Sequence, residues 1–423
     1  METIIIFIFI LGYLAITLEH PLRINKSASA LLTGVLVWVV WIMMSSESPE
    51  MIVEELNHHL SGAAGILFFL LAAMAIVELI DAHDGFTIIT SAINTRSKSK
   101  LLWLTCIITF FLSAVLDNLT STIVMVSLVR KIIDDKEDRM LFAGMIVIAA
   151  NAGGAWSPIG DVTTTMLWIG GQITAANIIT SLFIPSVVCL LIPLFFAGRK
   201  MKGEIPALVI QEGTVSVTTQ RERNAVFFIG VGTLLFVPIF KTITHLPPFM
   251  GILFGLGLLW AVVEFIHRRK DDDQKEFFSV SKALQRVDTP SVLFFLGILI
   301  AIGALESTHI LSEMAQWMND TVGNLPLIVT FIGLLSAIVD NVPLVAASMG
   351  MYDMGVYPTD HFLWEFMAYC AGTGGSILII GSAAGVAAMG MENISFVWYI
   401  KKISGYALIG YLAGAAIYVL MHH

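Results

Sequence analysis

The chain has 423 residues, of which 57% are hydrophobic and only 13% are charged, whereas soluble globular proteins average about 25% charged residues. This composition excludes a soluble protein, and no polar stretch is long enough to fold as a soluble domain on one membrane anchor. The acids behind the net charge of −9 are spread over short loops, and no basic block indicates nucleic-acid binding. The three cysteines lie in apolar segments, where we expect packing residues.

Apolar runs near the bilayer-spanning length of about 20 residues recur along the chain. They predict ordinary spans at 3–18, 27–44, 60–80, 174–197, 224–240, 248–266, 289–305 and 403–421. Four further apolar regions are interrupted by polar residues, Gly or Pro. They are 101–132, broken at Asp117-Asn118; 140–170, broken across Asn151–Asp161; 324–350, broken at Asp340-Asn341-Val342-Pro343; and 362–391, broken across Gly372–Ser382.

An internal repeat relates these broken regions. Three matches occur in the same order and at nearly the same offset: Ser113-Ala-Val-Leu-Asp-Asn118 with Ser336-Ala-Ile-Val-Asp-Asn341, Gly153-Gly154 and Gly160 with Gly374-Gly375 and Gly381, and Phe68-Phe69-Leu70 with Phe294-Phe295-Leu296. The likeness of all apolar sequences explains the last match but not a repeated Asp-Asn. We therefore predict N-terminal scaffold spans (1–57), a first repeat (58–200), linking spans and cytoplasmic loops (201–287) and a second repeat (288–423).

The positive charges predict the topology. If 101–132 and 324–350 are re-entrant hairpins and both other broken regions cross the membrane, all of the 23 Lys and Arg residues except Lys241 fall on one face. That face is then cytoplasmic, and both termini lie outside. The two repeats run in opposite directions through the membrane. We expect an all-α polytopic fold of inverted repeats, with one site between the two repeats near the midplane.

Acidic residues at membrane depth mark the candidate site. Asp117 and Asp340 lie between apolar arms at the two hairpin tips. A buried acid there costs about 3 kcal/mol even on low estimates, and such residues usually belong to ion or proton pathways. The alternative interpretation of each Asp-Asn pair is a helix cap at the level of the headgroups.

The broken crossing helices supply further oxygen atoms. The candidate ligands are Asn151, Ser157, Asp161, Thr163 and Thr164 in the first half and Thr373 and Ser376 in the second. Such oxygens suit hard cations such as Na⁺ or Li⁺, and the absence of thiolates and imidazoles from the breaks disfavours a soft transition metal. The chain has no phosphate-binding Gly-Lys motif and no enzyme constellation, so we expect neither a cofactor nor ATP coupling.

Glu78 and Glu306 end apolar spans and are candidates for a proton relay. The alternative is a plain interfacial position. His83 and His309 follow them in the two halves and carry the same choice between a pH-sensing and an interfacial role.

At these motifs the sequence resembles the ion transporter superfamily, which includes dicarboxylate and citrate transporters, arsenite permeases and NhaD-type sodium/proton antiporters. Dicarboxylate carriers of that superfamily typically carry Ser-Asn-Thr at both hairpin tips, where this chain has Asp117-Asn118-Leu119 and Asp340-Asn341-Val342. An added carboxylate repels a carboxylate substrate and attracts a cation. The chain therefore most resembles the NhaD type.

The resemblance implies a cation site with a contribution from each repeat. Its first half would be Asp117, Asn118, Asn151, Asp161, Thr163 and Thr164, with Na⁺ held by Asp117, Asn118, Asn151 and Asp161. Its second half would be Ser336, Asp340 and Asn341. Members of the superfamily are commonly homodimers.

We therefore expect a secondary antiporter of a bacterial inner membrane that exchanges cytoplasmic Na⁺, and also Li⁺, for external H⁺. The lipid bilayer and small cations are its expected partners, together with a second copy of the chain, and nucleic acid is not. An arsenite or carboxylate permease and an ion channel or membrane receptor are the alternatives. The inverted repeat disfavours a channel, because a channel needs no alternating geometry.

Overall fold

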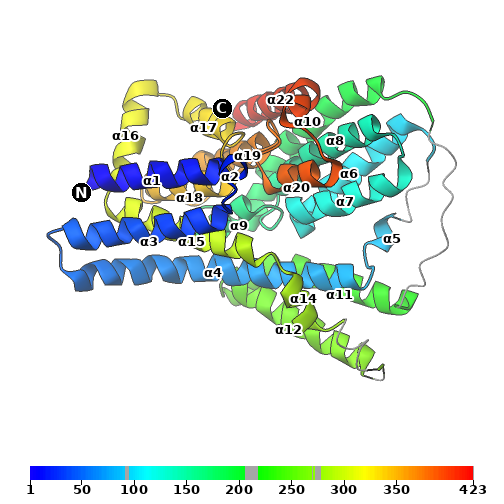
Figure 1. Ribbon diagram of the computed structural model, residues 1–423, viewed down its shortest axis with the longest axis horizontal. Helices are drawn as coiled ribbons and strands as arrows, with labels where there is room; N and C mark the ends of the chain where they lie inside the picture. The colour runs from blue at the N-terminus through cyan, green and yellow to red at the C-terminus, as the bar shows by residue number, and fades with distance from the viewer. Residues whose placement is uncertain (91–94, 205–217, 269, 272–277, 423) are drawn as a thin grey trace.

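The protein is a bundle of α-helices, as the computed structural model shows (Figure 1). The structure describes residues 1–90, 95–204, 218–268, 270–271 and 278–422. Only an isolated bridge between Ser97 and Glu204 has β geometry within these residues. Parts of the expected linking region 201–287, including Lys275, lie outside the described residues.

The helices of the first half follow the expected order of spans and breaks. They are α1 (Glu2–Thr17), α2 (Glu19–Leu22), α3 (Lys26–Met44), α4 (Pro49–Ala82), α5 (Thr87–Thr90), α6 (Lys98–Leu116), α7 (Asn118–Ile132), α8 (Lys136–Ala155), α9 (Val162–Ile169) and α10 (Ala175–Lys200). The first hairpin is α6 and α7, which meet at Asp117. The first discontinuous helix is α8 and α9.

The second half has the same plan after two linking spans. Its elements are α11 (Gln220–Thr244), α12 (Pro248–His267), α14 (Val280–Arg286), α15 (Thr289–Ser307), α16 (Ile310–Val322), α17 (Leu325–Leu335), α18 (Asn341–Met351), α19 (Phe362–Gly374), α20 (Ala383–Glu392), α21 (Phe396–Tyr399), a π-helical turn (Ile400–Ser404) and α22 (Gly405–His422). The second hairpin is α17 and α18, and the second discontinuous helix is α19 and α20.

The bundle has the length and composition of a membrane protein. Eight helices of the described ranges are long and apolar enough to cross a bilayer, or nine if the bent pair α16 and α17 is one span. α4 is longer than its predicted span because residues 49–59, capped by Ser48, extend the helix ahead of the apolar run. α16 was not predicted from the sequence, and its apolar residues Ile310, Leu311 and Ala315 are buried. The prediction of an all-α polytopic fold is confirmed.

Equivalent contacts in the two halves confirm the repeat. Ser113 Oγ, on α6, donates a hydrogen bond to the carbonyl of Ala150 on α8 at 2.6 Å. Ser336 Oγ, at the end of α17, donates to the carbonyl of Ala371 on α19 at 2.7 Å. Each repeat therefore holds its hairpin against its discontinuous helix through the same serine. In Figure 1 the first hairpin lies towards the right and the second towards the left, as inverted repeats require.

The breaks are shorter than the sequence indicated. Asn151 to Ala155 belong to α8, and Gly372 to Gly374 belong to α19, so the first break is 156–161 and the second is 375–382. The glycines of these segments allow close approach of the backbone, as expected, but they do so inside a helix and not in the break. Pro158 lies in the first break, where its missing N–H and its ring prevent a continuous helix.

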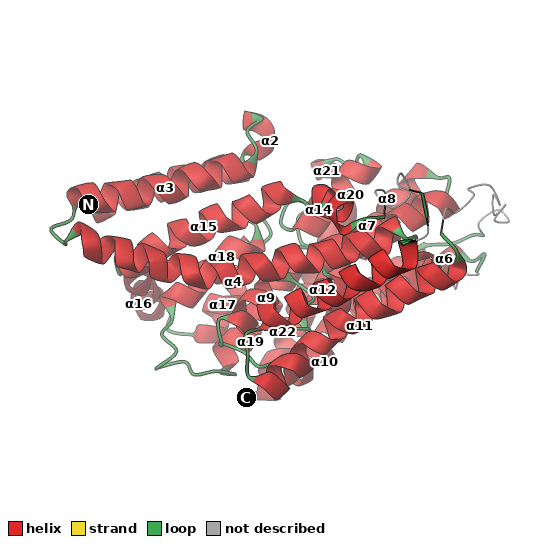
Figure 2. Ribbon diagram, turned by 90° about the horizontal axis from the view of Figure 1, so that it is seen from below, coloured by secondary structure: helices red, strands yellow, loops and turns green. Residues whose placement is uncertain are grey.

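A second layer beside the hairpins consists of α1, α3, α4, α11, α12 and α15. α3 packs along α15 and α1, while α4 packs against α12, α15 and α11. In Figure 2, α3 and α4 run along the hairpin region and α11 and α12 continue that layer. This layer supplies the outer wall of the cavity described next.

Candidate functional site

Four helix N-termini meet at one cavity. α7, α9, α18 and α20 begin there, and their first residues, Asn118, Val162, Asn341 and Ala383, line it. A helix N-terminus carries a partial positive charge and by itself favours an anion. The charge of the cavity therefore depends on the side chains of the four N-cap residues as well as on the helix ends.

Three of these caps are carboxylates. Asp117 caps α7, Asp161 caps α9 and Asp340 caps α18, whereas Ser382 caps α20. Each accepts a hydrogen bond from a backbone N–H of the first turn that follows. The carboxylates offset the four helix ends, so the cavity is suited to a cation. The aspartates are helix caps and also line a buried cavity, so a capping role is compatible with a role in an ion site.

Asp161 is the most deeply buried of the three acids, with 2% of its surface exposed. Its Oδ1 accepts hydrogen bonds from the backbone N–H of Thr163 at 2.9 Å and from Thr163 Oγ1 at 2.8 Å. Asn118 Nδ2 donates to Oδ2 at 2.5 Å. Asn341 Nδ2, from the other repeat, lies 3.3 and 3.4 Å from the two oxygens. Both hairpin tips therefore contact the same carboxylate.

An amide bridge extends this contact between the repeats. Asn118 Nδ2 also lies 3.0 Å from Asn151 Oδ1. Asn151 Nδ2 donates to Ser376 Oγ at 2.9 Å and to Ser382 Oγ at 3.0 Å. Asn151 is fully buried and does not line the cavity. Its hydrogen bonds connect the first hairpin to the second discontinuous helix in the layer of residues outside the cavity lining.

Asp117 forms a strained tip. Its backbone has φ 95° and ψ 161°, a region that non-glycine residues rarely adopt and that clusters at functional sites. Its Oδ1 accepts from the N–H of Thr120 at 2.7 Å and its Oδ2 from Thr120 Oγ1 at 2.9 Å. The equivalent Asp340 has an ordinary φ of −50°. The two tips are therefore alike in sequence and different in geometry.

The acids also differ in their charged partners. Lys26 Nζ, at the start of α3, lies 2.9 Å from Asp340 Oδ2. Within the described residues, neither Asp117 nor Asp161 forms an ion pair. A buried carboxylate is costly unless it is protonated or paired with a cation. The cavity thus holds two carboxylates that a mobile cation or a proton can satisfy.

Several of the predicted hydroxyl ligands bind backbone carbonyls instead of facing the cavity. Ser157 donates to Ala114, Ser336 to Ala371, Thr373 to Tyr369 and Thr164 to Asp161. These hydrogen bonds fix the positions of the helix ends next to the breaks. Of the predicted site residues, those that line the cavity are Asp117, Asn118, Asp161, Asp340 and Asn341. Thr163, Asn151 and Ser376 form the hydrogen-bonded layer behind them.

The two candidate relay glutamates are not brought to this cavity. Glu78 lines a separate pocket with Asp81, Asp84 and Lys131. Glu306 lines another with His58 and His59. His83 is fully buried, and its Nε2 lies 2.9 Å from His267 Nε2.

Lys26, Phe69 and Phe295 are among the lining residues of the cavity that the sequence did not indicate as site residues. Lys26 was counted only as a loop cation, and Phe69 and Phe295 form part of the apolar wall. These two phenylalanines are equivalent members of the repeated Phe-Phe-Leu motif. The repetition of this motif was therefore a signal of the site, although general apolar similarity seemed to explain it.

A family model described as "Citrate transporter" (CitMHS) matches residues 5–372. The chain belongs to the citrate transporter family. Sodium/proton antiporter 1 of Arabidopsis thaliana is 50% identical over 98% of this chain and 72% of its own length. The Na⁺/H⁺ antiporter NhaD of Vibrio cholerae is 30% identical over 98% of this chain and 91% of its own. These relatives confirm the predicted resemblance to the NhaD type.

The fold comparison agrees with the predicted fold. The solved structure of the YdaH transporter from Alcanivorax borkumensis matches with a TM-score of 0.59, covering 92% of this chain and 97% of that one. At 11% identity this likeness shows the fold alone. The relatives and the apolar helices together show an integral membrane transporter.

Proposed function

We propose that the chain is a secondary antiporter that exchanges cytoplasmic Na⁺, and also Li⁺, for external H⁺. The observation that carries the proposal is the pair Asp117 and Asp161, two carboxylates on one cavity without a basic partner among the described residues. The names of the relatives from Arabidopsis and Vibrio support sodium and protons as the exchanged ions.

The proposed mechanism is competition for the two carboxylates. Like charges in a low-dielectric cavity favour protonation of one acid unless a cation lies between them. Na⁺ therefore expels a proton when it binds, and a proton expels Na⁺. Titration belongs to the pair and not to either residue. Alternating exposure of the site between the inverted repeats delivers each ion to the opposite side.

The family description makes a carboxylate permease the second candidate. Four helix N-termini at the cavity favour an anionic substrate in principle. Here three of the four N-caps are aspartates, at Asp117, Asp161 and Asp340, which repel a carboxylate. The charge of the caps therefore favours the cation. Neutral arsenite, the remaining alternative of this class, is included in the transport test.

Exchange should be directly visible in vesicles. In inside-out vesicles acidified by respiration, addition of Na⁺ or Li⁺ should dequench a pH-sensitive dye, because entry of the cation releases protons from the lumen. K⁺, citrate and arsenite should leave the dye quenched. Vesicles without the protein are the control. Dequenching by citrate or arsenite, with no response to Na⁺, would contradict the proposal and favour a permease.

The proposed orientation has both termini outside and the loops at 131–139, 198–223 and 268–287 in the cytoplasm of a bacterium. Its support is the asymmetry of Lys and Arg along the sequence and the bacterial source of the NhaD relatives. With a bacterial source, the membrane is the inner membrane. A homodimer is proposed on the resemblance alone.

Single cysteines test this orientation. Cysteines that replace Asp134 or Lys202, both exposed, should resist an impermeant thiol reagent in intact cells and react after the cells are opened. A cysteine replacing Glu47, in the exposed loop between α3 and α4, should react in intact cells. Cys106, Cys189 and Cys370 are buried, so the background should be low. Labelling of Lys202→Cys from outside would overturn the orientation.

A further inference from the structure

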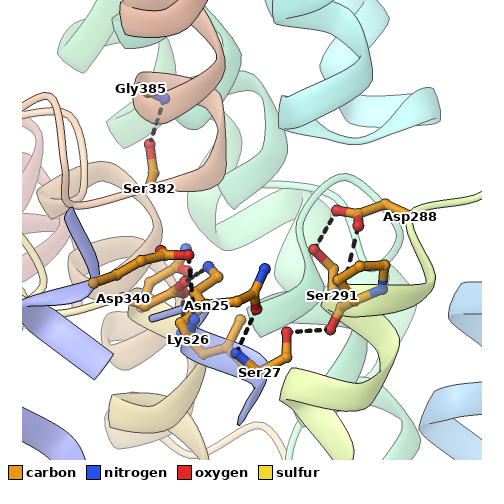
Figure 3. A network of polar contacts seen from close by, with 12 residues as sticks. Asn25, Lys26, Ser27, Asp288, Ser291, Asp340, Ser382 and Gly385 are labelled. Atoms are coloured by element: carbon orange, nitrogen blue, oxygen red, sulfur yellow. Dashed lines mark hydrogen bonds and ion pairs between the residues drawn. The ribbon is translucent and has the colours of Figure 1, made fainter. Parts of the chain in front are cut away.

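Lys26 brings a positive charge to the cavity from a helix outside both hairpins. Its ammonium lies 2.9 Å from Asp340 Oδ2, and the two side chains are 25% and 16% exposed. The same ammonium lies 4.5 Å from the centroid of the Phe294 ring. Lys26 and Asp340 line the cavity together with Asp117 and Asp161. Figure 3 shows Lys26 directed at Asp340.

The backbone that carries Lys26 is firmly anchored. Asn25 Oδ1 accepts a hydrogen bond from the N–H of Ser27 at 2.8 Å and so caps α3. Ser27 Oγ donates to the carbonyl of Pro290 at 2.6 Å, which fixes the start of α3 to the start of α15 (Figure 3). Asp340, by contrast, is at the tip of the second hairpin. The ion pair therefore joins α3 to an element of the ion site.

The position of Lys26 opposes the usual preference of helix ends. It is the first residue of α3, where the helix dipole disfavours a cation. The Lys26 side chain therefore does not stabilise α3, and its role lies in the contact with Asp340.

A second cavity gives the ammonium an alternative partner. Lys26 and Asp340 also line this cavity, which contains Glu19 and Ser382. Glu19 Oε1 already accepts a hydrogen bond from the backbone N–H of Lys26 at 3.2 Å. An ammonium displaced from Asp340 thus has a carboxylate beside its own backbone. The ion pair borders both cavities, with the cation site on one side and Glu19 on the other.

We infer that Lys26 is a tethered cation that competes with Na⁺ for Asp340, and that Na⁺ binding breaks the link between α3 and the second hairpin. The inference rests on the proposed Na⁺ site. Asn341, next to Asp340, lies 3.3 Å from an oxygen of Asp161, so Na⁺ at Asp161 is close to the pair. Two cations beside one carboxylate repel each other, and the ammonium moves towards Glu19.

Removal of the tethered charge should tighten Na⁺ binding. Lys26→Gln should lower the half-saturating Na⁺ concentration on the order of tenfold, the effect of removing one nearby charge in a partly hydrated site. The maximal exchange rate should fall because bound Na⁺ leaves more slowly. Lys26→Met, which keeps an unbranched chain over Phe294, should shift half-saturation equally. Asp340→Asn leaves Lys26 unpaired and should raise half-saturation, and the double variant should lie between the two single variants.

The readouts are dye dequenching in vesicles and Na⁺-dependent thermal stabilisation of the purified protein, with choline replacing Na⁺ at constant ionic strength. Lys98→Gln is the matched control, because Lys98 is the first residue of α6, is 23% exposed and pairs with Asp138 away from the cavity. Half-saturation that is unchanged or raised in both Lys26 variants would overturn the inference. Binding shifts without proton movement in the wild type would overturn only the antiport proposal, whereas absence of Na⁺ stabilisation in the wild type would overturn both.

Discussion

Replacement of Asp117 by asparagine should abolish Na⁺-driven proton movement while leaving a folded protein in the membrane. Asparagine caps a helix about as well as aspartate, and its Oδ1 can still accept the N–H of Thr120, which lies 2.7 Å from the present Oδ1. The variant therefore removes the charge and keeps the hairpin tip. Without that charge the cavity keeps a single unpaired carboxylate, which cannot exchange a proton for Na⁺ as a pair.

Asp161→Asn should also abolish exchange, but at a cost to stability. Asp161 Oδ2 accepts from Asn118 Nδ2 and lies near Asn341 Nδ2, so an amide nitrogen at this place faces two donors. Loss of such buried hydrogen bonds costs about 1–3 kcal/mol. Asp340→Asn should weaken exchange without abolishing it, because Lys26 already neutralises that carboxylate.

Dye dequenching at several Na⁺ concentrations, with the amount of folded protein measured by size-exclusion chromatography, tests both variants. Asp135→Asn is the matched control for Asp117→Asn, because Asp135 caps α8 through the N–H of Asp138 at an exposed site. Normal exchange in both Asp117→Asn and Asp161→Asn would show that the ions bind elsewhere. Glu306, which lines a separate pocket, would then be the next candidate.

The parts of the site that the sequence predicted are those that a local pattern records. A polar pair such as Asp117-Asn118 inside a long apolar run is rarely explained by structure alone. Its repetition at Asp340-Asn341 makes a chance occurrence a poor explanation as well. The breaks near Pro158 and Ser382 were visible for the same reason. The inverted repeats and the contribution of both halves to the site followed from these local patterns together with the distribution of Lys and Arg along the chain.

The parts that were missed depend on contacts between distant segments. A lysine at the end of an apolar span usually marks the membrane interface, so nothing local indicated that Lys26 pairs with Asp340. The hydrogen bonds of Asn151 to Ser376 and Ser382 likewise join residues of different repeats. Hydroxyls such as Ser157 looked like ligands, although buried hydroxyls most readily satisfy a nearby carbonyl.

The repeated glycines were recognised as a motif that allows close approach of the backbone, but they were placed in the breaks and not in the helices. Gly153 and Gly374 are helical residues. A Cβ atom on Gly153 would lie 2.1 Å from the carbonyl oxygen of Phe110, and one on Gly374 would lie 2.0 Å from that of Gly333. Each glycine therefore lets the discontinuous helix touch the backbone of its hairpin. Small residues commonly permit such close approach between membrane helices.

Alanine at either glycine should therefore destabilise the protein strongly. The contact is with backbone atoms, which cannot rotate away as a side chain can, so the helices must separate. Overpacking of this kind costs about 3 kcal/mol, and a loss of that size lowers the unfolding temperature by roughly 3–4 °C in a chain of 423 residues. Gly153→Ala and Gly374→Ala should thus show a lower transition temperature, less folded protein and little exchange.

Gly232→Ala in α11 and Gly390→Ala in α20 are matched controls, because a Cβ atom at either position meets nothing within 4 Å. Alanine favours a helix over glycine by about 1 kcal/mol, so these variants should unfold at the same or a higher temperature. The difference between the two pairs isolates the backbone contact from the general effect of adding a methyl group. Gly153→Ala and Gly374→Ala proteins as stable as the controls would mean that hairpin and discontinuous helix do not touch at these glycines, and that each repeat is held together chiefly by Ser113 and Ser336.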